Sequence, residues 1–246
     1  MNNNKITVIP AIDIIGGKAV RLTQGDYARQ RTYSDRPEEL ARQFADNGAR
    51  WLHLVDLDGA KSSAPENLAV LERIVSSSDI SVEWGGGIKS EDSLRSVFDA
   101  GASVAICGSI AVKAPDIFSS WLKRFGPEKI ALGLDLRNGK VAVSGWIENS
   151  DYSACGLAGR FIPAGLSQVI CTDISKDGML SGPSWPVYQE LRTMFPDMSL
   201  TVSGGVASAS DIEEADALGL DRIIVGKALY EGLLTMEELG KWWRKE

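Results

Sequence analysis

Short apolar runs rich in β-branched residues alternate along this chain with longer segments of helical periodicity. The short runs predict buried strands at residues 6–12, 51–55, 80–84, 103–107, 129–134, 168–171, 200–202 and 222–225. The longer segments predict helices at residues 37–47, 68–75, 91–100, 116–124, 152–162, 185–194, 210–218 and 236–245. Eight strands alternating with helices, and no linker-like stretch, predict an α/β fold with a single (β/α)8 TIM barrel over residues 1–246. A doubly wound open sheet is the alternative.

The second half of the chain repeats the first. The aligned pairs are Gly86 with Gly204 (204 − 86 = 118), Gly108 with Gly226 (226 − 108 = 118), and Asp13 with Asp135 (135 − 13 = 122). A repeat of this kind predicts an internal half-barrel repeat, with halves at about 1–125 and 126–246. Because four strands and four strands make eight, the repeat favours the closed ring over the open sheet.

Composition and charge limit the classes of partner that the protein is expected to bind. The 246 residues are 44% hydrophobic and 24% charged, and a formal net charge of −7 argues against nucleic acid, which needs a basic face. We find neither an apolar run of about 20 residues nor a signal peptide, so we expect a cytoplasmic protein without a membrane segment. Three scattered cysteines predict reduced thiols and show no metal-ligand spacing. We therefore expect no bound metal. We also expect that the protein needs no cofactor and is a monomer.

The candidate chemistry follows from the barrel, in which working groups sit at the carboxyl ends of the strands. Asp13 and Asp135 end strands that are four places apart in a ring of eight, so they should face each other across the mouth. One of them would need a pKa raised above about 3.9 to act as an acid near pH 7. Strands that end in glycine and lead into a helix can bring backbone N–H groups close to a phosphate. Two such cradles are predicted, one at Gly86, Gly87, Gly108 and Ser109, and one at Ser203, Gly204, Gly205, Gly226 and Lys227.

Several motifs carry a resemblance to a known family. They are Ala11–Ile14 (AIDI), Gly17–Tyr27 (GKAVRLTQGDY), Leu52–Ala60 (LHLVDLDGA), Gly85–Ile88 (GGGI), Leu134–Val141 (LDLRNGKV), Ser144–Trp146 (SGW), Thr172–Gly178 (TDISKDG), Ser203–Val206 (SGGV) and Ile224–Tyr230 (IVGKALY). In this order, over nearly the whole chain, they resemble the ProFAR isomerases of histidine biosynthesis. Met179 and Lys89 depart from the family pattern, which has threonine and arginine there. Lys89 lacks the forked anion contact of arginine.

The resemblance implies an Amadori rearrangement, in which an aminoaldose with two phosphates opens its ribose ring and becomes an aminoketose. It implies that Asp13 is the base, that Asp135 is the acid with Thr172 positioning it, and that Asp177 is a second candidate acid. It further implies that Trp146 stacks on the imidazole base and that Arg21 contacts the substrate. The small-molecule bisphosphate would then be held at both ends by the two predicted cradles.

Other interpretations of the same residues remain open. Asp56 and Asp173 can simply brace loops, and His53 is more typical of a packed, hydrogen-bonded residue. Cys107 and Cys171 are interpreted as lining the barrel. Rival functions are the cyclase of the same pathway, for which we expect Ser-Xaa-Asp where this chain has Thr172 and Asp173, a dual-substrate isomerase that also serves tryptophan synthesis, and a non-catalytic sugar-phosphate sensor.

Overall fold

The computed structural model describes residues 6–23 and 26–243 of the chain. Three sequence-based expectations fall partly outside these residues. They are the absence of a signal peptide at Met1–Lys5, the motif position Gly25, and the end of the last helix at Lys245.

Eight parallel strands form a closed ring, as predicted. They are β1 (Thr7–Ile15), β4 (Trp51–Asp56), β5 (Ser81–Gly85), β6 (Val104–Cys107), β7 (Ile130–Arg137), β10 (Gln168–Asp173), β11 (Ser199–Ser203) and β12 (Arg222–Val225). Each strand pairs with the next, β12 pairs with β1, and β10 pairs with β7. No edge is left open in this ring, so the fold is a (β/α)8 barrel and the open sheet is excluded.

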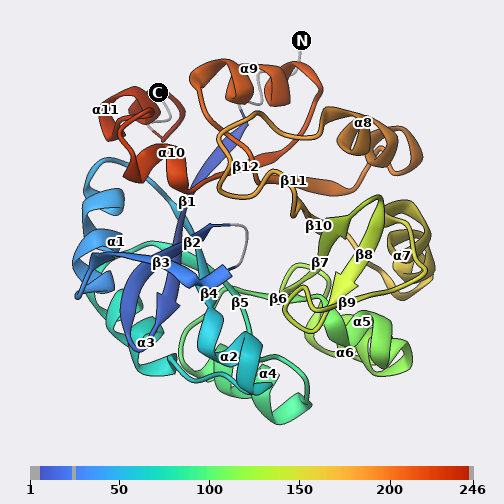
Figure 1. Cartoon of the computed structure of the whole chain (residues 1–246). Coiled ribbons are helices and arrows are strands. Elements are labelled where there is room, and N and C mark those ends of the chain that lie inside the picture. Colours follow the sequence, from blue (N-terminus) through green and yellow to red (C-terminus); the bar gives the residue numbers. More distant parts are fainter. Residues whose placement is uncertain (1–5, 24–25, 244–246) are drawn as a thin grey trace.

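Helices surround the barrel on its outside (Figure 1). The predicted ones are α1 (Pro37–Asp46), α3 (Leu68–Ser77), α4 (Glu91–Asp99), α6 (Pro115–Phe125), α7 (Ala154–Phe161), α8 (Trp185–Met194), α9 (Ala209–Ala217) and α11 (Met236–Trp243). Local signals explain several of their ends. Ser90 caps α4 in a capping box with Ser93, and Pro37 occupies the first turn of α1, where a missing N–H does no harm.

The sequence did not predict the elements that lie outside the regular alternation. These are the strands β2 (Lys18–Thr23), β3 (Asp26–Ser34), β8 (Lys140–Val143) and β9 (Glu148–Asn149), the helices α2 (Leu57–Ser62), α5 (Ser109–Lys113) and α10 (Lys227–Tyr230), and the 3-10 turn η1 (Ile162–Ala164). β2 pairs antiparallel with the outer part of β1, and β8 pairs in the same way with β7. β3 is polar and exposed over most of its length, so it carries no alternation of apolar and polar residues by which it could be predicted.

The apolar core has two layers. A small cluster fills the inside of the barrel, made up of Ile9, Ala11, Val104, Ala131, Ile170 and Ile224. The larger cluster joins the outer face of the strands to the helices. Cys107 and Cys171 belong to this outer cluster, so the prediction that they line the barrel is wrong. Their neighbours Ile106 and Ile170 point inward, and side chains of a strand alternate between its two faces.

Candidate active site

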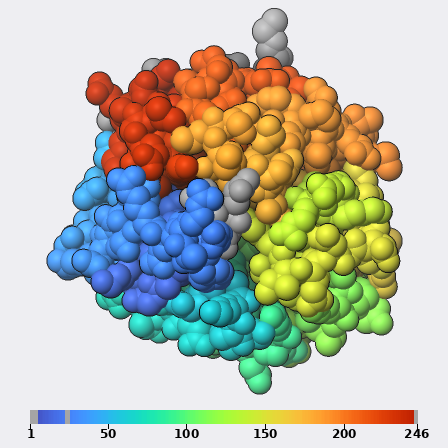
Figure 2. All heavy atoms as spheres, in the orientation of Figure 1, coloured from blue at the N-terminus to red at the C-terminus, as the bar shows by residue number. Residues whose placement is uncertain are grey.

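A cavity of about 250 Å³ lies at the carboxyl ends of the barrel strands, and we call it the chamber. Figure 2 shows this face of the molecule, with a depression near its centre between the N-terminal (blue) and the yellow-green segments. The chamber is lined by every residue that the sequence predicted for the site, namely Asp13, Arg21, Gly86, Gly87, Gly108, Ser109, Asp135, Trp146, Thr172, Asp177, Ser203, Gly204, Gly205, Gly226 and Lys227. The residues that the sequence analysis selected therefore lie together at one place in the fold.

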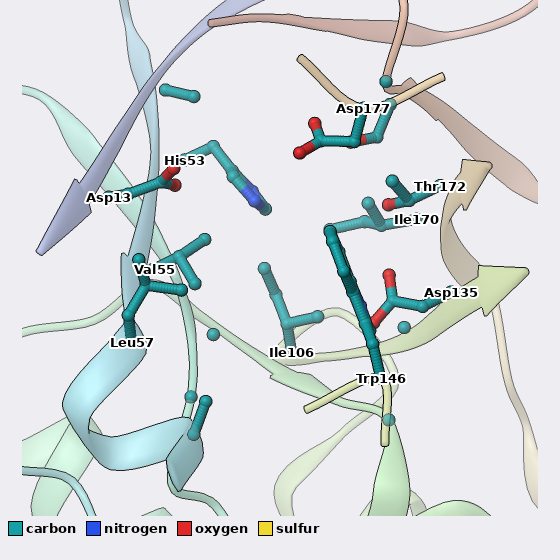
Figure 3. A pocket seen from close by; sticks show the side chains of 18 of the residues that line it. Asp13, His53, Val55, Leu57, Ile106, Asp135, Trp146, Ile170, Thr172 and Asp177 are labelled. Carbon is teal, nitrogen blue, oxygen red and sulfur yellow. The ribbon is translucent and has the colours of Figure 1, made fainter. Parts of the chain in front are cut away.

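Asp13 and Asp135 lie on opposite sides of the chamber (Figure 3). Asp13 belongs to β1 and Asp135 to β7, and the ring of strands places both carboxyl groups at the same end of the barrel. Burial raises the pKa of both groups above the usual value for an aspartate, because the ionised form loses hydration inside the protein. Each group is therefore shifted toward the range in which a carboxyl can exchange protons near neutral pH.

Arg21, from the hairpin strand β2, joins two acids of the site. Its Nη1 lies 2.8 Å from Asp13 Oδ2, and its Nη2 lies 2.6 Å from Asp177 Oδ1. Burial alone would lower the pKa of the guanidinium, but the charges of Asp177 and Asp13 raise it above its ordinary value. The buried Nε of Arg21 has no hydrogen-bond partner among the described residues, so the guanidinium retains one unused donor.

Asp135 has different neighbours. The side chains of Trp146 and Thr172 hydrogen-bond to its carboxyl group, and Thr172 is its register partner on the adjacent strand β10. Among the described residues its carboxylate is in no ion pair, unlike those of Asp13 and Asp177. The two opposed acids therefore differ in environment, since one faces a cation and the other faces neutral donors.

Trp146 sits on a turn of left-handed backbone. Its φ is +70° and that of Ser144 is +58°, both uncommon for residues other than glycine. The N–H of Ser144 donates to Ser109 Oγ at 2.9 Å, and Lys113 Nζ donates to Ser144 Oγ at 2.7 Å. These contacts with α5 keep the turn, and with it the indole, over the chamber.

The backbone conformation requires glycine at the paired positions of the two predicted cradles, Gly86–Gly87 and Gly204–Gly205. Gly87 has φ +78° and Gly205 has φ +88°. A side chain at Gly87 would collide with the backbone of Ala64, and a side chain at Gly205 would collide with that of Gly182. The next strand along the ring after each pair of glycines, β6 or β12, is followed by a single glycine, Gly108 or Gly226, which leads directly into α5 or α10. A barrel phosphate site is often built in this way, from two loops and the start of a short extra helix.

Asp56 and His53 lie on opposite faces of β4, as the spacing predicted. Asp56 is fully buried and accepts hydrogen bonds from the N–H groups of Gly59, Glu66 and Asn67 and from the Asn67 side chain. It therefore braces the loop after β4, which is the plainer of its two interpretations. His53 is hydrogen-bonded, as expected, but it also lines the chamber, which the sequence analysis did not predict.

The sequence analysis also missed Glu83, the partner of His53. The residue is 1% exposed and lies on β5 between the buried side chains of Val82 and Trp84. A charged residue inside an apolar strand was a visible signal, because such groups are almost never fully buried without a partner.

No group of three or more His, Cys, Asp or Glu side chains in the described part of the chain is arranged to hold a metal ion. No helix within residues 6–23 and 26–243 is both long and apolar enough to cross a membrane.

Comparison with known proteins identifies relatives over nearly the whole chain. The protein of Cytophaga hutchinsonii named 1-(5-phosphoribosyl)-5-((5-phosphoribosylamino)methylideneamino) imidazole-4-carboxamide isomerase is 49% identical over 237 residues, which are 96% of this chain and 99% of that protein. Proteins of the same name from Bacteroides thetaiotaomicron and Parabacteroides distasonis are 48% and 46% identical, each over 95% of this chain and 98% of its own length.

These relatives confirm the resemblance that the motifs indicated. The family model described as "Histidine biosynthesis protein" matches residues 7–235, which include every strand of the ring. The chain belongs to the histidine biosynthesis protein family.

Proposed function

We propose that this protein isomerises the bisphosphorylated aminoaldose ProFAR to the corresponding aminoketose. ProFAR is the imidazole carboxamide after which its relatives are named. One observation carries the proposal: Asp13 and Asp135 face each other across a single chamber (Figure 3). An Amadori rearrangement needs a proton removed from C2 of the sugar and a proton delivered to the ring oxygen, and two opposed carboxyl groups can do both.

In this proposal Asp13 is the base and Asp135 is the acid. Arg21 lies 2.8 Å from Asp13 and favours its carboxylate form, the form that accepts a proton. Within the described part of the chain Asp135 has no such cation, and its burial supports the protonated form that an acid needs. Thr172 positions Asp135 through their hydrogen bond. Asp177, the second candidate acid, is ion-paired to Arg21, which favours Asp135 as the proton donor.

The two ends of the substrate are assigned to the two cradles. Gly86, Gly87, Gly108 and Ser109 would hold one phosphate through their backbone N–H groups, and Ser203, Gly204, Gly205, Gly226 and Lys227 would hold the other. Support comes from the positive φ and the close backbone approaches of the paired glycines. The imidazole base would lie between the cradles, with Trp146 stacked on it and Arg21 near the opened sugar.

The same proposal includes an origin in two halves, at about 1–125 and 126–246. The antiparallel hairpins that follow β1 and β7 support it, because they occupy equivalent places in the ring. The capping serines of α4 and α9, Ser90 and Ser208, keep the offset of the glycines (208 − 90 = 118).

We infer further that the protein works as a monomer in the cytoplasm. The three cysteines are free, as is usual for a reducing compartment, which supports the cytoplasmic location. Size-exclusion chromatography with light scattering tests the oligomeric state, and a dimer would contradict it.

The decisive experiment is a turnover assay on ProFAR and on phosphoribosyl anthranilate in parallel, with EDTA present. Conversion of ProFAR alone supports the proposal, and conversion of both compounds would identify a dual-substrate isomerase. Conversion of neither would favour the sensor. The cyclase is tested in the same series with the aminoketose product and an ammonia source.

Substitution of the two aspartates tests their roles. Asp13→Asn and Asp135→Asn should each lower kcat by about 100-fold or more, because each removes a group that moves a proton in the reaction. Asp177→Asn should lower kcat less than Asp135→Asn if Asp135 is the acid. The reverse order would transfer the acid role to Asp177.

A further inference from the structure

A row of charged and aromatic side chains lies inside the barrel beneath the chamber, and we call it the relay: Trp51, Arg222, Glu83 and His53. The interior of such barrels is usually filled with branched apolar residues. Here a carboxylate that is 1% exposed takes one of those places. Because an ionised group loses hydration when it is buried, such a residue needs partners that stabilise its charge.

Both oxygens of Glu83 face a basic side chain. Oε1 lies 2.7 Å from His53 Nδ1, and Oε2 lies 3.6 Å from Arg222 Nη1. The guanidinium of Arg222 in turn lies over the Trp51 ring, 4.5 Å from its centroid. His53 and Glu83 are register partners on the adjacent strands β4 and β5, so the backbone itself sets their side chains next to each other.

The relay fixes which ring nitrogen of His53 carries a proton toward the protein. A carboxylate accepts hydrogen bonds, so the 2.7 Å contact places a proton on Nδ1. Nε2 is then the nitrogen left for a ligand, and the ring points into the chamber on the side of Asp13 (Figure 3). A buried polar contact of this kind commonly sets the tautomer and orientation of a working histidine.

The position of His53 also matters for the charges of the two aspartates. Burial raises the pKa of Asp13 and of Asp135, and a positive charge on His53 would lower the pKa of both. The imidazole therefore lies near enough to influence both acids, which sit on opposite sides of the chamber.

We propose that Glu83, oriented by Arg222, is a positioning residue that fixes the imidazole of His53 so that its Nε2 faces the sugar of the bound substrate. The inference rests on the proposed isomerase function, and it assigns no proton transfer to Glu83 itself. Its alternative is that the relay merely fills the barrel. A filler would be expected to affect stability, whereas a positioning residue affects turnover and the state of the histidine ring.

The first test uses the fact that the chain contains a single histidine. In tag-free protein labelled with ¹⁵N-histidine, the wild type should show one ring state with Nδ1 protonated. Glu83→Gln keeps the shape of the side chain but removes its charge, so the ring should become a mixture of tautomers. An unchanged ¹⁵N spectrum in this variant would overturn the inference.

The second test is kinetic. Glu83→Gln should lower kcat on ProFAR by about 10- to 100-fold, the range of one charged hydrogen bond, with a smaller change in KM. If Glu83 acts through His53, the double variant Glu83→Gln/His53→Asn should be no slower than His53→Asn alone. Independent, multiplying effects in the double variant would contradict the inference.

Controls separate the possible failures. Asp221→Asn removes a carboxylate from an ion pair with Arg192 at the other end of the barrel and should leave kcat and the ¹⁵N spectrum unchanged. If Glu83→Gln does not fold, Arg222→Gln replaces it and should alter the spectrum in the same direction. A wild type that does not convert ProFAR overturns the proposed function and the purpose of the relay together. An active wild type with an equally active Glu83→Gln overturns the relay alone.

Discussion

Asp135 is a buried acid whose charged form the fold disfavours. Its pKa lies above the usual value because of burial, with Trp146 and Thr172 partly offsetting that effect through hydrogen bonds. When the folded-state pKa of an acid is raised, the folded protein binds more protons than the unfolded chain over the interval between the two pKa values. Stability therefore decreases as the pH rises through that interval. At neutral pH the burial of Asp135 therefore lowers the stability of the folded protein.

The consequence can be measured with Asp135→Asn. Asparagine has nearly the same shape but no charge, so the variant should have a higher Tm than the wild type near pH 7. The difference should shrink as the pH falls toward about 4, where a free aspartate becomes protonated. Thermal unfolding at several pH values checks this prediction.

Asp197→Asn serves as the control, because Asp197 lies exposed on the surface and should show no such gain. An Asp135→Asn variant that is less stable than the wild type at every pH would show that the hydrogen bonds of Asp135 outweigh its desolvation.

Among elements, those with a repeating apolar pattern could be predicted from the sequence, and those without it could not. The ring strands and the large helices bury one or both faces, so apolar residues recur at the period of the element. α5 and α10 have only five and four residues, which is too short for a helical period to show. β3 presents polar residues to solvent and is placed by its pairing with β2 rather than by burial.

The start of α4 gives a prediction at this scale. Ser90 Oγ accepts the N–H of Ser93 at 3.1 Å, and the Ser93 hydroxyl accepts the N–H of Ser90 at 2.9 Å. Ser90→Ala leaves one N–H of the first turn without its acceptor and should lower the free energy of unfolding by about 1 kcal/mol. Urea unfolding would measure the change.

Ser90→Thr retains a capping hydroxyl and should restore most of the loss. If both variants were as stable as the wild type, the capping box would not contribute to stability.

In the molecule as a whole, the carboxyl end of the barrel carries the chamber, and the amino end carries contacts that stabilise the fold. The predicted site residues all line the chamber at the carboxyl ends of the strands. At the amino ends, Asp221 Oδ2 lies 2.5 Å from Arg192 Nη2 and accepts the N–H of Leu200 at 2.9 Å. These contacts of Asp221 connect the start of β11 to α8 and involve none of the residues that line the chamber.

Asp221→Asn should therefore lower the free energy of unfolding by about 1 kcal/mol while kcat stays the same. Denaturation and turnover measured on the same preparation check both parts. A fall in kcat would show that the amino end of the barrel influences the chamber.

The ring and the grouping of the candidate residues at the chamber could be predicted, because both follow from the order of the strands along the chain. Strand ends in such a barrel converge at one mouth, so Asp13 and Asp135 could be paired without coordinates. The link from Arg21 to Asp13 and Asp177 could not, since it depends on the pairing of β2 with β1, which only the folded chain fixes. The contact of Glu83 with His53 depends on the register of β4 and β5, which only the folded ring fixes.

The pairing of β1 with β12 also has a consequence for synthesis on the ribosome. The edge of β1 that receives β12 emerges early, but its partner begins only at Arg222. At a synthesis rate of about 5–20 residues per second, about 10 to 40 seconds pass before the strand that pairs with this edge has been made. During this time the nascent chain presents an unpaired, apolar strand to its surroundings, so its yield in the cell should depend on translation speed and on chaperones that shield it.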